Sequence, residues 1–415
     1  MKVLYFIGMP IPKVSEYIGV KKNYFGGWLT TTIEALSIHP DIDLTVLSPY
    51  KGKVIKTFEV EDVKYYFIPM KSFKDIDKKL LEMSINEINP DISHMEGTEF
   101  KYHKTFMKVC DSLKVVSLQG ILNSYFPHIN GGLITSKLLF SLVPSKFLLG
   151  ISLIMRKIKF KYRMSIEKSI LKSADNFLGR TIWDKSHSRF YNSSATYYEA
   201  PRILRPPFYS SVWNIDNIER HTIYIGNADK PLKGAHILFE ALKALKNDYP
   251  EIKVYVAGKN PYSRNILKNA FKNAYSNYLV QFIKKNKLQE NIVFLGELSE
   301  IQVSEYLLRS NVYCLCSSIE NSPNSLAEAM AIGTPSISSY VGGVSSMAND
   351  NEDVLFYRFG DIPVLTELIR KVFDNDDLAL NLSKKSRAKA LSNHSKEQVI
   401  ENLYACYLDI ITKGK

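Results

Sequence analysis

Short β-branched runs alternate with longer helical patterns along this chain, and the whole alternation occurs twice. That arrangement is typical of parallel βαβ architecture. The runs of the first half each end at Gly, Pro or a small turn residue, as strands do before a connection. The expected strands are KVLYFIG, DLTVLSP, VKYYFIP, DISHMEG, KVVSLQG and DNFLG in the first half, and TIYIGN, IKVYVAG, NIVFLGE, VYCLCSS, PSISSY and DVLFY in the second. The sequence therefore predicts an α/β fold built from two Rossmann-like, doubly wound domains.

Two adjacent prolines, Pro206 and Pro207, mark the break between the halves, because proline interrupts a helix or a central strand. A chain of 415 residues also exceeds one ordinary hydrophobic core, which favours two domains. We expect domains at residues 1–205 and 206–392, and an amphipathic C-terminal helix at 393–415 that packs on either domain and is able to cross back to the first. Similar domains of this kind are expected to face each other across a central cleft.

Composition excludes several classes of protein. Four cysteines without a CxxC pair argue against a disulfide framework or a zinc site and indicate a reducing compartment. No GxGxxG or P-loop spacing occurs, which argues against a dehydrogenase or a P-loop NTPase. The net charge of +12 is concentrated in residues 101–180, which hold 14 basic side chains against 3 acidic ones. This segment has no recognisable RNA or DNA module, so nucleic acid is not an expected partner.

An apolar helix that contains one carboxylate is the most unusual local feature, in the stretch ENSPNSLAEAMAIGTP. Ser322 is expected to cap this helix, Pro323 to open it and Gly333 to end it. The helix has no polar face, which is the pattern of a buried helix, yet it contains Glu328. No lysine or arginine lies three or four positions away, and burying a lone carboxylate is expensive. Either a distant basic residue of the core or a bound ligand is expected to meet this charge.

Two further motifs follow the first strand of each half, where doubly wound sheets bind their ligands. Gly26 and Gly27 open a helix in GGWLTTTIEAL, and adjacent glycines allow backbone amides to approach an anion, although a plain turn explains them equally well. Lys233 stands at the start of a helix in IGNADKPLKGAHILFEAL. A cation at that end opposes the helix dipole, so Lys233 is expected to be either solvated or held by an anion.

Together these motifs resemble the retaining glycosyltransferases of family 4, which have a GT-B architecture, and the resemblance covers nearly the whole chain. The family has two glutamates separated by seven residues at its donor site, and these correspond to Glu320 and Glu328. Its pyrophosphate-binding lysine corresponds to Lys233, and its N-domain glycine loop to Gly26 and Gly27. The family's Gly-Thr-Pro and Gly-Gly elements are matched by Gly333, Thr334, Pro335, Gly342 and Gly343.

The resemblance implies transfer of a sugar, with retention of configuration, from a nucleotide-diphosphate sugar to a saccharide or lipid-linked acceptor in cell-surface polysaccharide synthesis. Glu320 is expected to accept hydrogen bonds from the transferred sugar, and Glu328 from the ribose hydroxyls. Lys233 is expected to neutralise the leaving diphosphate. The donor is expected to be UDP- or GDP-linked, with no metal and no further cofactor. The backbone amides that suit the diphosphate, at the N-terminus of the helix, are those of Asn324, Ser325 and Leu326.

Two positions depart from the family pattern. Asn227 stands where the family commonly has an arginine six residues before the lysine, so one phosphate-binding cation is missing. Lys230, Arg180 and Arg205 are the candidates to replace that charge. Gln119 stands where a histidine often lies near the transferred sugar, and glutamine can hydrogen-bond a sugar hydroxyl but cannot hold a proton near neutral pH. Gln119 is still expected to belong to the catalytic centre.

Two other functions remain open. A transferase of the GT-A type would use a metal-binding DxD motif, and DID occurs at Asp41–Asp43 and Asp75–Asp77, although solvated or helix-capping acids explain both. A GT-B domain pair that binds a nucleotide sugar without turnover is suggested by Asn227 and Gln119, whereas the two glutamates and Lys233 argue against it. A donor-hydrolysis assay would separate turnover from binding.

Residues 134–164 combine an apolar stretch with a basic cluster, which predicts docking to an anionic membrane surface. The longest uncharged run inside this segment, Phe147 to Met155, has nine residues, far short of the roughly 20 needed to span a bilayer. The alternative is that the leucines pack the core and the basic cluster is a solvated face. Docking would make the chain a cytoplasmic protein, peripheral at the inner face of the membrane, with a lipid-linked saccharide as acceptor.

Overall fold

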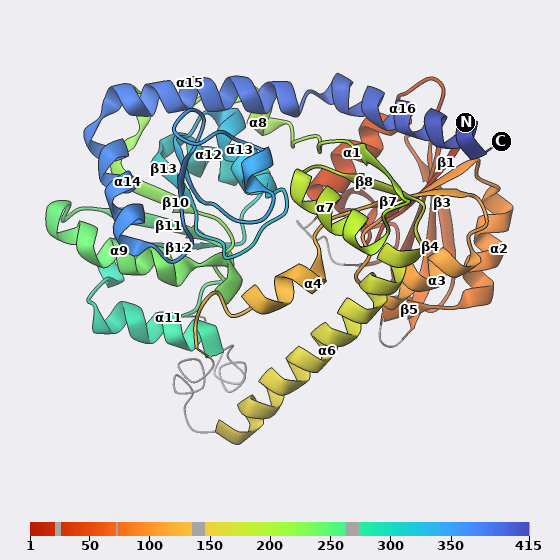
Figure 1. The fold of residues 1–415 in the computed structure, drawn as a ribbon, viewed down its shortest axis with the longest axis horizontal. Coiled ribbons are helices and arrows are strands. Elements are labelled where there is room, and N and C mark those ends of the chain that lie inside the picture. The colour runs from red at the N-terminus through yellow and green to blue at the C-terminus, as the bar shows by residue number, and fades with distance from the viewer. Residues whose placement is uncertain (21–25, 72–73, 135–145, 263–273, 415) are drawn as a thin grey trace. The chain divides into compact units, whose positions relative to one another are not determined.

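The structure is a computed structural model that describes residues 1–20, 26–71, 74–134, 146–262 and 274–414, without the side chains of 146–156 and 274. The chain divides into two compact units, and each contains a mainly parallel sheet covered by helices (Figure 1). The first unit consists of Met1–Asn123, Lys159–Arg205 and His394–Lys415, and the second of Ser124–Ile158 and Pro206–Asn393. The α/β fold class predicted from the sequence is confirmed, whereas Ser124–Ile158 falls in a different unit from the one expected.

In the described residues, the sheet of the first unit has nine strands, in the order β3-β4-β2-β1-β6-β7-β8-β9, with β5 paired to β4. Only β3 and β5 run antiparallel to their neighbour β4 among these described pairs. The strands are β1 Lys2–Phe6, β2 Asp43–Tyr50, β3 Lys56–Val60, β4 Val63–Lys71, β5 Asp75–Ile76, β6 Ile92–Glu96, β7 Leu113–Ser117, β8 Asn176–Gly179 and β9 Thr196–Glu199. The six strands predicted for the first half are present as β1, β2, β4, β6, β7 and β8.

Strands β3, β5 and β9 were not predicted, and the reason is physical. β3 pairs with β4 in a hairpin whose turn residues, Glu61 and Asp62, both have positive φ, 50° and 60°. Its residues alternate between half-buried and exposed, so no continuous apolar run marks it. β5 has two residues, and β9 is an edge strand whose side chains are half-buried or exposed. Short or solvent-facing strands of this kind carry a weak hydrophobic signal.

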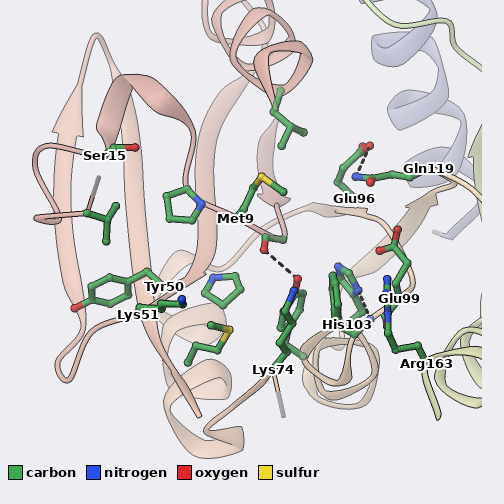
Figure 2. Close-up of a pocket in the computed structure, with 18 of the residues that line it drawn as sticks. Met9, Ser15, Tyr50, Lys51, Lys74, Glu96, Glu99, His103, Gln119 and Arg163 are labelled. Atoms are coloured by element: carbon green, nitrogen blue, oxygen red, sulfur yellow. Dashed lines mark hydrogen bonds between the residues drawn. The ribbon is translucent and has the colours of Figure 1, made fainter. Parts of the chain in front are cut away.

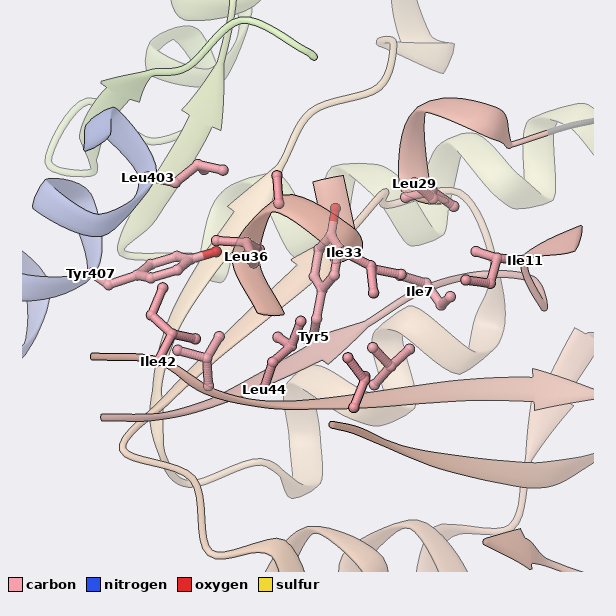
Figure 3. Packing of buried hydrophobic residues seen from close by; sticks show 14 of the residues in the cluster. Tyr5, Ile7, Ile11, Leu29, Ile33, Leu36, Ile42, Leu44, Leu403 and Tyr407 are labelled. Carbon is pink, nitrogen blue, oxygen red and sulfur yellow. The ribbon is translucent and has the colours of Figure 1, made fainter. Parts of the chain in front are cut away.

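The core of the first unit lies on both faces of its sheet, because side chains of one strand alternate between the faces. Val3 and Tyr5 pack in one cluster with α1 and α16, and Figure 3 shows Tyr5 and Tyr407 among its members. Leu4 and Phe6 pack in a second cluster with α2, α3 and α6. The helices are α1 Gly27–Ser37, α2 Lys78–Ile88, α3 Lys101–Val109, α7 Ile182–Tyr191 and α16 Lys396–Gly414. α4 Leu122–Tyr125 and α6 Lys146–Ser173 each begin in one unit and end in the other. The C-terminal helix α16 therefore belongs to the core of the first unit.

The described part of the second unit contains a six-stranded parallel sheet in the order β12-β11-β10-β13-β14-β15. Its strands are β10 Glu219–Ile225, β11 Lys253–Ala257, β12 Ile292–Gly296, β13 Ser310–Leu315, β14 Ser336–Ser339 and β15 Leu355–Tyr357. All six correspond to the strands predicted for the second half. Its main helices are α8 Pro207–Ser210, α9 Ala235–Asp248, α11 Ala274–Lys285, α12 Glu300–Arg309, α13 Asn324–Ile332, α14 Ile362–Asp374 and α15 Asp376–Asn393. The strand order reverses between β10 and β13, which is where such sheets bind ligands.

Helix α13 is buried from Leu326 to Ile332, as its lack of a polar face predicted. Its N-cap is Pro323 rather than Ser322, because Pro323 has an extended ψ of 114° and the helix begins one residue later than expected. Gly333 ends the helix with a φ of 89°, a conformation that favours glycine. The guanidinium of Arg387, from α15, donates to the carbonyl of Ala331 and so satisfies the last turn.

Candidate functional site

The loops after β10 and β13 bring an ion pair to the point where the second sheet reverses its strand order. Lys233 ends the 3-10 turn Pro231–Lys233, and Glu320 lies in the loop between β13 and α13. The Lys233 Nζ lies 2.5 Å from Glu320 Oε1, and the Ser317 hydroxyl donates to the same oxygen at 2.7 Å. Glu320 is only 6% exposed, so its charge is compensated within the protein. Of the two states expected for Lys233, the structure has the one in which an anion holds it.

Gly234 allows the lysine loop to lie against the end of β13. Its φ is 71°, and a Cβ added there would lie 1.7 Å from the carbonyl oxygen of Cys316. The backbone of the two loops is also tied directly, since the amide of Ser318 donates to the carbonyl of Leu232 at 2.7 Å. The Lys-Gly pair in the sequence therefore reflects two needs, a cation and a close approach of backbone.

Gly342 plays the corresponding part for Glu320. A Cβ at this position would lie 1.9 Å from the carbonyl oxygen of Glu320, and its φ is 53°. The next residue, Gly343, donates its amide to that same carbonyl at 3.0 Å. The loop after β14 thus fixes the backbone of Glu320, while Lys233 and Ser317 fix its carboxylate.

The N-terminus of α13 presents free amide groups next to Glu320 in the sequence. The cap, Pro323, has no side-chain hydrogen bond, and among the described residues no acceptor is bonded to the amides of Asn324 and Ser325. The amide of Leu326 donates to the Pro323 carbonyl at 3.1 Å, so this third amide, which the sequence assigned to the donor, is already engaged. The Ser325 hydroxyl is positioned by Tyr313, which donates to it at 2.8 Å. Unsatisfied amides at a helix N-terminus form a suitable place for an anion.

Glu328 lies inside α13 and is 6% exposed, as expected for a carboxylate in a buried helix. Its side chain is not isolated, since the residue takes part in a further interaction within the protein. The sequence-based alternatives, a core partner or a ligand, are therefore compatible with one another, because a carboxylate oxygen has room for more than one donor.

Three cations are candidates to replace the arginine that is missing at Asn227, and they do not all lie in the second unit. Asn227 is exposed with a φ of 57°, directly after β10. Lys230 is exposed in the same loop, three residues before Lys233. Arg180 and Arg205 belong to the first unit, where Arg180 is 8% exposed and donates to the Leu118 carbonyl. Of the three candidates, Lys230 is therefore the one that lies on the same loop as Lys233.

The glycine pair of the first unit opens α1 and lies close to neighbouring side chains. Gly26 caps α1 with a φ of 89°. A Cβ at Gly27 would lie 2.8 Å from Cδ of Arg205, so the arginine chain occupies the space that a side chain would need. Residues 21–25, which precede the pair, lie outside the described part of the chain.

Gln119 is held by a buried charged cluster that the sequence did not predict. Its Nε2 donates to Glu96 Oε1 at 3.2 Å, and Arg202 donates to the same oxygen at 3.1 Å. Tyr5 donates its hydroxyl to the other oxygen at 3.2 Å. Burial would raise the pKa of Glu96, but the charges of Arg202 and its neighbours outweigh burial and hold that pKa below its ordinary value. The signal for this cluster in the sequence was the polar residues His94 and Glu96 in a strand that is buried throughout.

A cavity of about 700 Å³ lies beside this cluster in the first unit (Figure 2). Loops that follow β1, β2, β6 and β7 line the cavity, and they contribute Met9, Lys51, Glu99 and Gln119, respectively. The strand order of this sheet reverses between β1 and β6, so the cavity also lies at a switch point. Its size is within the range of small-molecule binding sites.

The two DID sequences have structural roles. Asp77 caps α2 by accepting hydrogen bonds from two backbone amides, and Asp75 forms an ion pair of 2.7 Å with Lys101. Asp41 accepts a hydrogen bond from Tyr404 at 3.0 Å, and Asp43 begins β2. Helix capping and surface pairing therefore account for these acids, in agreement with the prediction of solvated or capping acids.

The predicted membrane-docking segment, residues 134–164, falls largely outside the description. Residues 135–145 and the side chains of 146–156 are not described. In the described part of α6, Lys159 and Lys161 are exposed and Lys157 is half-buried. Among the described helices, none combines the length and apolar character that crossing a membrane would require. Docking to a membrane surface stays a prediction.

Comparison with known families identifies the second unit. The sequence profile of the family described as "Glycosyl transferases group 1" matches residues 207–389, a range that contains Lys233, Glu320 and Glu328. N-acetyl-alpha-D-glucosaminyl L-malate synthase of Bacillus anthracis is 23% identical over 137 residues, which are 33% of this chain and 35% of that protein. The chain spans about a third to just over half the length of the curated relatives that it matches. Residues 207–389 thus carry a group 1 glycosyltransferase domain.

Solved structures similar to the whole chain have the GT-B fold. Sucrose-phosphate synthase from Thermosynechococcus elongatus has a TM-score of 0.69 at 13% identity and covers 100% of both chains. HepE from Anabaena, in complex with UDP-glucose, has a TM-score of 0.67 at 12% identity, with 99% of this chain and 100% of that chain covered. The chain therefore has a two-domain α/β fold of the GT-B type, and the alternative of a GT-A transferase is wrong.

Proposed function

We propose that this chain, which carries a group 1 glycosyltransferase domain, transfers a sugar from a nucleotide-diphosphate sugar to a saccharide acceptor in polysaccharide or glycoconjugate synthesis. The observation that carries the proposal is the pair of Lys233 and Glu320 at the switch point of the second sheet, with the free amides of α13 following in the chain. The donor is UDP- or GDP-linked. The HepE structure with UDP-glucose supports a nucleotide sugar of this kind.

The diphosphate of the donor binds where positive charge is available. The amides of Asn324 and Ser325 donate to its oxygens, and the dipole of α13 favours the negative charge. Lys233 neutralises the charge that develops on the leaving diphosphate. Lys233 is held by Glu320 in the structure, so donor binding exchanges one carboxylate for a group with about two negative charges, which attracts the lysine more strongly.

The two glutamates bind the two ends of the donor. Glu320, released from Lys233, accepts hydrogen bonds from hydroxyls of the transferred sugar. Glu328 lies five residues beyond Pro323, or roughly 7.5 Å along the helix axis at about 1.5 Å per residue, and accepts from the ribose hydroxyls. The separation matches a ligand that presents sugar, diphosphate and ribose in that order.

Transfer proceeds with retention of configuration, as in family 4. The acceptor hydroxyl attacks the anomeric carbon from the face that the diphosphate leaves, so the new carbon–oxygen bond forms where the old one breaks. The proton of the hydroxyl passes to an oxygen of the leaving phosphate, which removes the need for a protein base. Glu320 then serves as a binder of the sugar rather than a nucleophile, and its charge stabilises the oxocarbenium-like transition state. Gln119, held by Glu96, offers its amide to a sugar hydroxyl.

The test is turnover of a panel of UDP- and GDP-sugars by the full chain, with release of nucleotide measured in EDTA. Hydrolysis or transfer of one donor, with the configuration of the product determined by NMR, would support a retaining reaction without a metal. Binding without turnover would favour the second candidate, a nucleotide-sugar-binding protein, which the replacement of the family's arginine and histidine by Asn227 and Gln119 suggests. Loss of activity in EDTA that Mn²⁺ restores would contradict the metal-independent reaction.

A further inference from the structure

The cavity of the first unit has an excess of positive charge. Arg163, Lys51 and Lys74 line it, together with the carboxylates of Glu96 and Glu99. Glu96 is neutralised by Arg202, which lies 3.1 Å from it. Three cations therefore face one uncommitted carboxylate. Figure 2 shows these side chains around the cavity, with Glu99 and Arg163 on one wall.

Two of the cations contact the same aromatic ring, that of Phe100. The Lys74 Nζ lies 3.7 Å and the Arg163 Cζ 4.4 Å from the centroid of Phe100. The Nε of Arg163 donates to the backbone carbonyl of Glu99 at 3.3 Å, which fixes the side chain without neutralising it. Within the described part of the chain, no carboxylate oxygen lies within 4.0 Å of a side-chain nitrogen of Arg163, Lys74 or Lys51. An anion in the cavity would offset the repulsion among these like charges.

The pKa values of the neighbouring groups agree with a site that lacks its anion. Burial lowers the pKa of Lys74, and the charges of Arg163 and Lys51 lower it further, whereas the charge of Glu99 acts in the opposite direction. Burial raises the pKa of Glu99 despite the nearby charge of Arg163, so this carboxylate compensates the cations poorly. Lys74 and Arg163 would both be stabilised by a negatively charged group in the cavity.

An unpartnered donor points to the same ligand chemistry. His103 lines the cavity and is 1% exposed. Its Nδ1 accepts a hydrogen bond from the Phe100 amide at 3.1 Å, so the proton of the neutral ring lies on Nε2. Among the described residues, this Nε2 has no acceptor in good hydrogen-bond geometry, although the backbone of Glu96 lies near enough to raise the pKa of the ring. Burial lowers the pKa of His103 to about 3, so the ring stays a neutral donor at physiological pH. A buried donor without an acceptor is costly unless a ligand supplies one.

We propose that this cavity binds an anionic group, a carboxylate or a phosphate, carried by the acceptor saccharide. The inference rests on the proposed function, because it names the class of its acceptor. The guanidinium fork of Arg163 is suited to either group, and Lys74 and the Nε2 of His103 add donors. Gln119 and Glu96 on the same cavity suit the hydroxyls of the sugar that carries the anion. Uronic-acid residues and sugar phosphates are the two sources of such a group.

The test is calorimetric titration of the full chain at low salt with three matched probes: methyl glucuronoside, glucose 6-phosphate and neutral methyl glucoside. We expect the charged sugars to bind at least tenfold more tightly than the neutral one, and the stronger of the two identifies the source. Arg163→Gln and Lys74→Gln should each remove most of this preference, whereas Arg163→Lys should retain part of it. Arg189→Gln and Lys64→Gln, which change exposed cations outside the cavity lining, should leave it unchanged.

Titration of the same variants with UDP and GDP separates this inference from the proposed function. Undiminished nucleotide binding by folded Arg163→Gln, with loss of the charged sugars, would support the anion site. Equal binding of charged and neutral sugars, or binding of none of the three, would overturn the anion site. If the chain still bound UDP or GDP, the glycosyltransferase proposal would not be affected. A fall in nucleotide affinity as large as the fall in sugar affinity would also overturn the anion site, since the cations would then serve the donor. Melting temperatures of all variants establish that they are folded.

Discussion

Lys233 and Glu320 form a 2.5 Å ion pair across 87 residues of sequence, and the Ser317 hydroxyl donates to the same carboxylate oxygen. The pair joins the first and fourth strands of the second sheet at the point where their order reverses. Each charge is thereby compensated before any ligand arrives. Donor binding then requires an exchange of partners, which makes the pair part of both the stability and the proposed activity of the protein.

Replacement of Lys233 should separate these two contributions. Lys233→Ala removes the cation from the leaving diphosphate, and we expect transfer to fall by about 10²–10³-fold. It also leaves Glu320 buried without its partner, so the melting temperature should fall as well. The double variant Lys233→Ala/Glu320→Gln should recover the melting temperature but not the transfer rate. Measurement needs a transfer assay and thermal denaturation of the same preparations.

The matched control for this prediction is Lys243→Ala in the helix that follows. Lys243 is exposed and pairs only loosely, at 3.6 Å, with Glu240. Its loss should change neither transfer nor melting temperature. Wild-type transfer by folded Lys233→Ala would show that the lysine does not act on the donor.

A pair of glycines in the same loop tests the close packing that positions Lys233. Gly234→Ala would place a Cβ 1.7 Å from the Cys316 carbonyl and at a φ of 71°, so it should destabilise the second unit and weaken nucleotide binding strongly. Gly226→Ala lies a few residues earlier and has no neighbour within 4 Å of its Cβ, so it should be tolerated. Circular dichroism melts and nucleotide titration of both variants give the comparison. If both variants melted and bound nucleotide alike, the close approach of the loop to β13 would not be needed to position Lys233.

Much of this arrangement could be predicted from the sequence, because the signals were local. The buried strands had continuous apolar runs. Lys233 and Glu328 stood out as charges that a helix N-terminus or a buried helix disfavours, and Glu320 was identified through the family motif that it shares with Glu328. The contact between Lys233 and Glu320 could not be predicted from spacing, since it depends on which strands are neighbours. The cavity cations come from separate parts of the chain: Lys51 follows β2, whereas Arg163 lies on α6. Their proximity is a property of topology and not of any motif.

Buried histidines should make the protein sensitive to acid. Burial lowers the pKa of His94 and of His236 to about 4 and that of His103 to about 3, from an ordinary value of 6.5. The folded state then binds fewer protons than the unfolded state between those values, so stability is lost as the pH falls from about 6.5 to 4. Glu167 acts in the opposite direction, because burial raises its pKa to about 7 and its contribution is lost as the pH rises from 4.5 to 7.

Burial also raises the pKa of Glu99, but the three histidines outnumber these two carboxyl groups, and we expect the melting temperature to fall on acidification below pH 6.5. His236→Asn should lower the melting temperature at neutral pH, since two hydrogen bonds to the ring are lost. The same variant should show a smaller change of melting temperature with pH. Thermal denaturation at half-unit intervals from pH 7.5 to 4.5 measures both. A melting temperature that rises steadily over this range as the pH falls would contradict the assignment.

The membrane-docking prediction can be tested without further structure. Full-length protein should sediment with vesicles that contain anionic lipid, and the binding should weaken as salt is added. Charge reversal at Lys157, Lys159 and Lys161, all in the described part of α6, should reduce it. Charge reversal at Lys384 and Lys385 of α15, in the second unit, is the control. Equal binding to neutral vesicles, or no binding to either, would remove the membrane surface from the account and leave a soluble acceptor.

The most direct test of the central claim is an equilibrium titration of the full chain with UDP, GDP and their common sugars in EDTA, repeated with Glu328→Gln. We predict that one nucleotide binds and that Glu328→Gln weakens it by about tenfold or more, because hydrogen bonds from the ribose to a carboxylate are lost. Glu367→Gln, an exposed carboxylate of α14, should have no effect. If no nucleotide binds to the folded protein, or if Glu328→Gln binds as tightly as the wild type, the assignment of the donor site at α13 is contradicted.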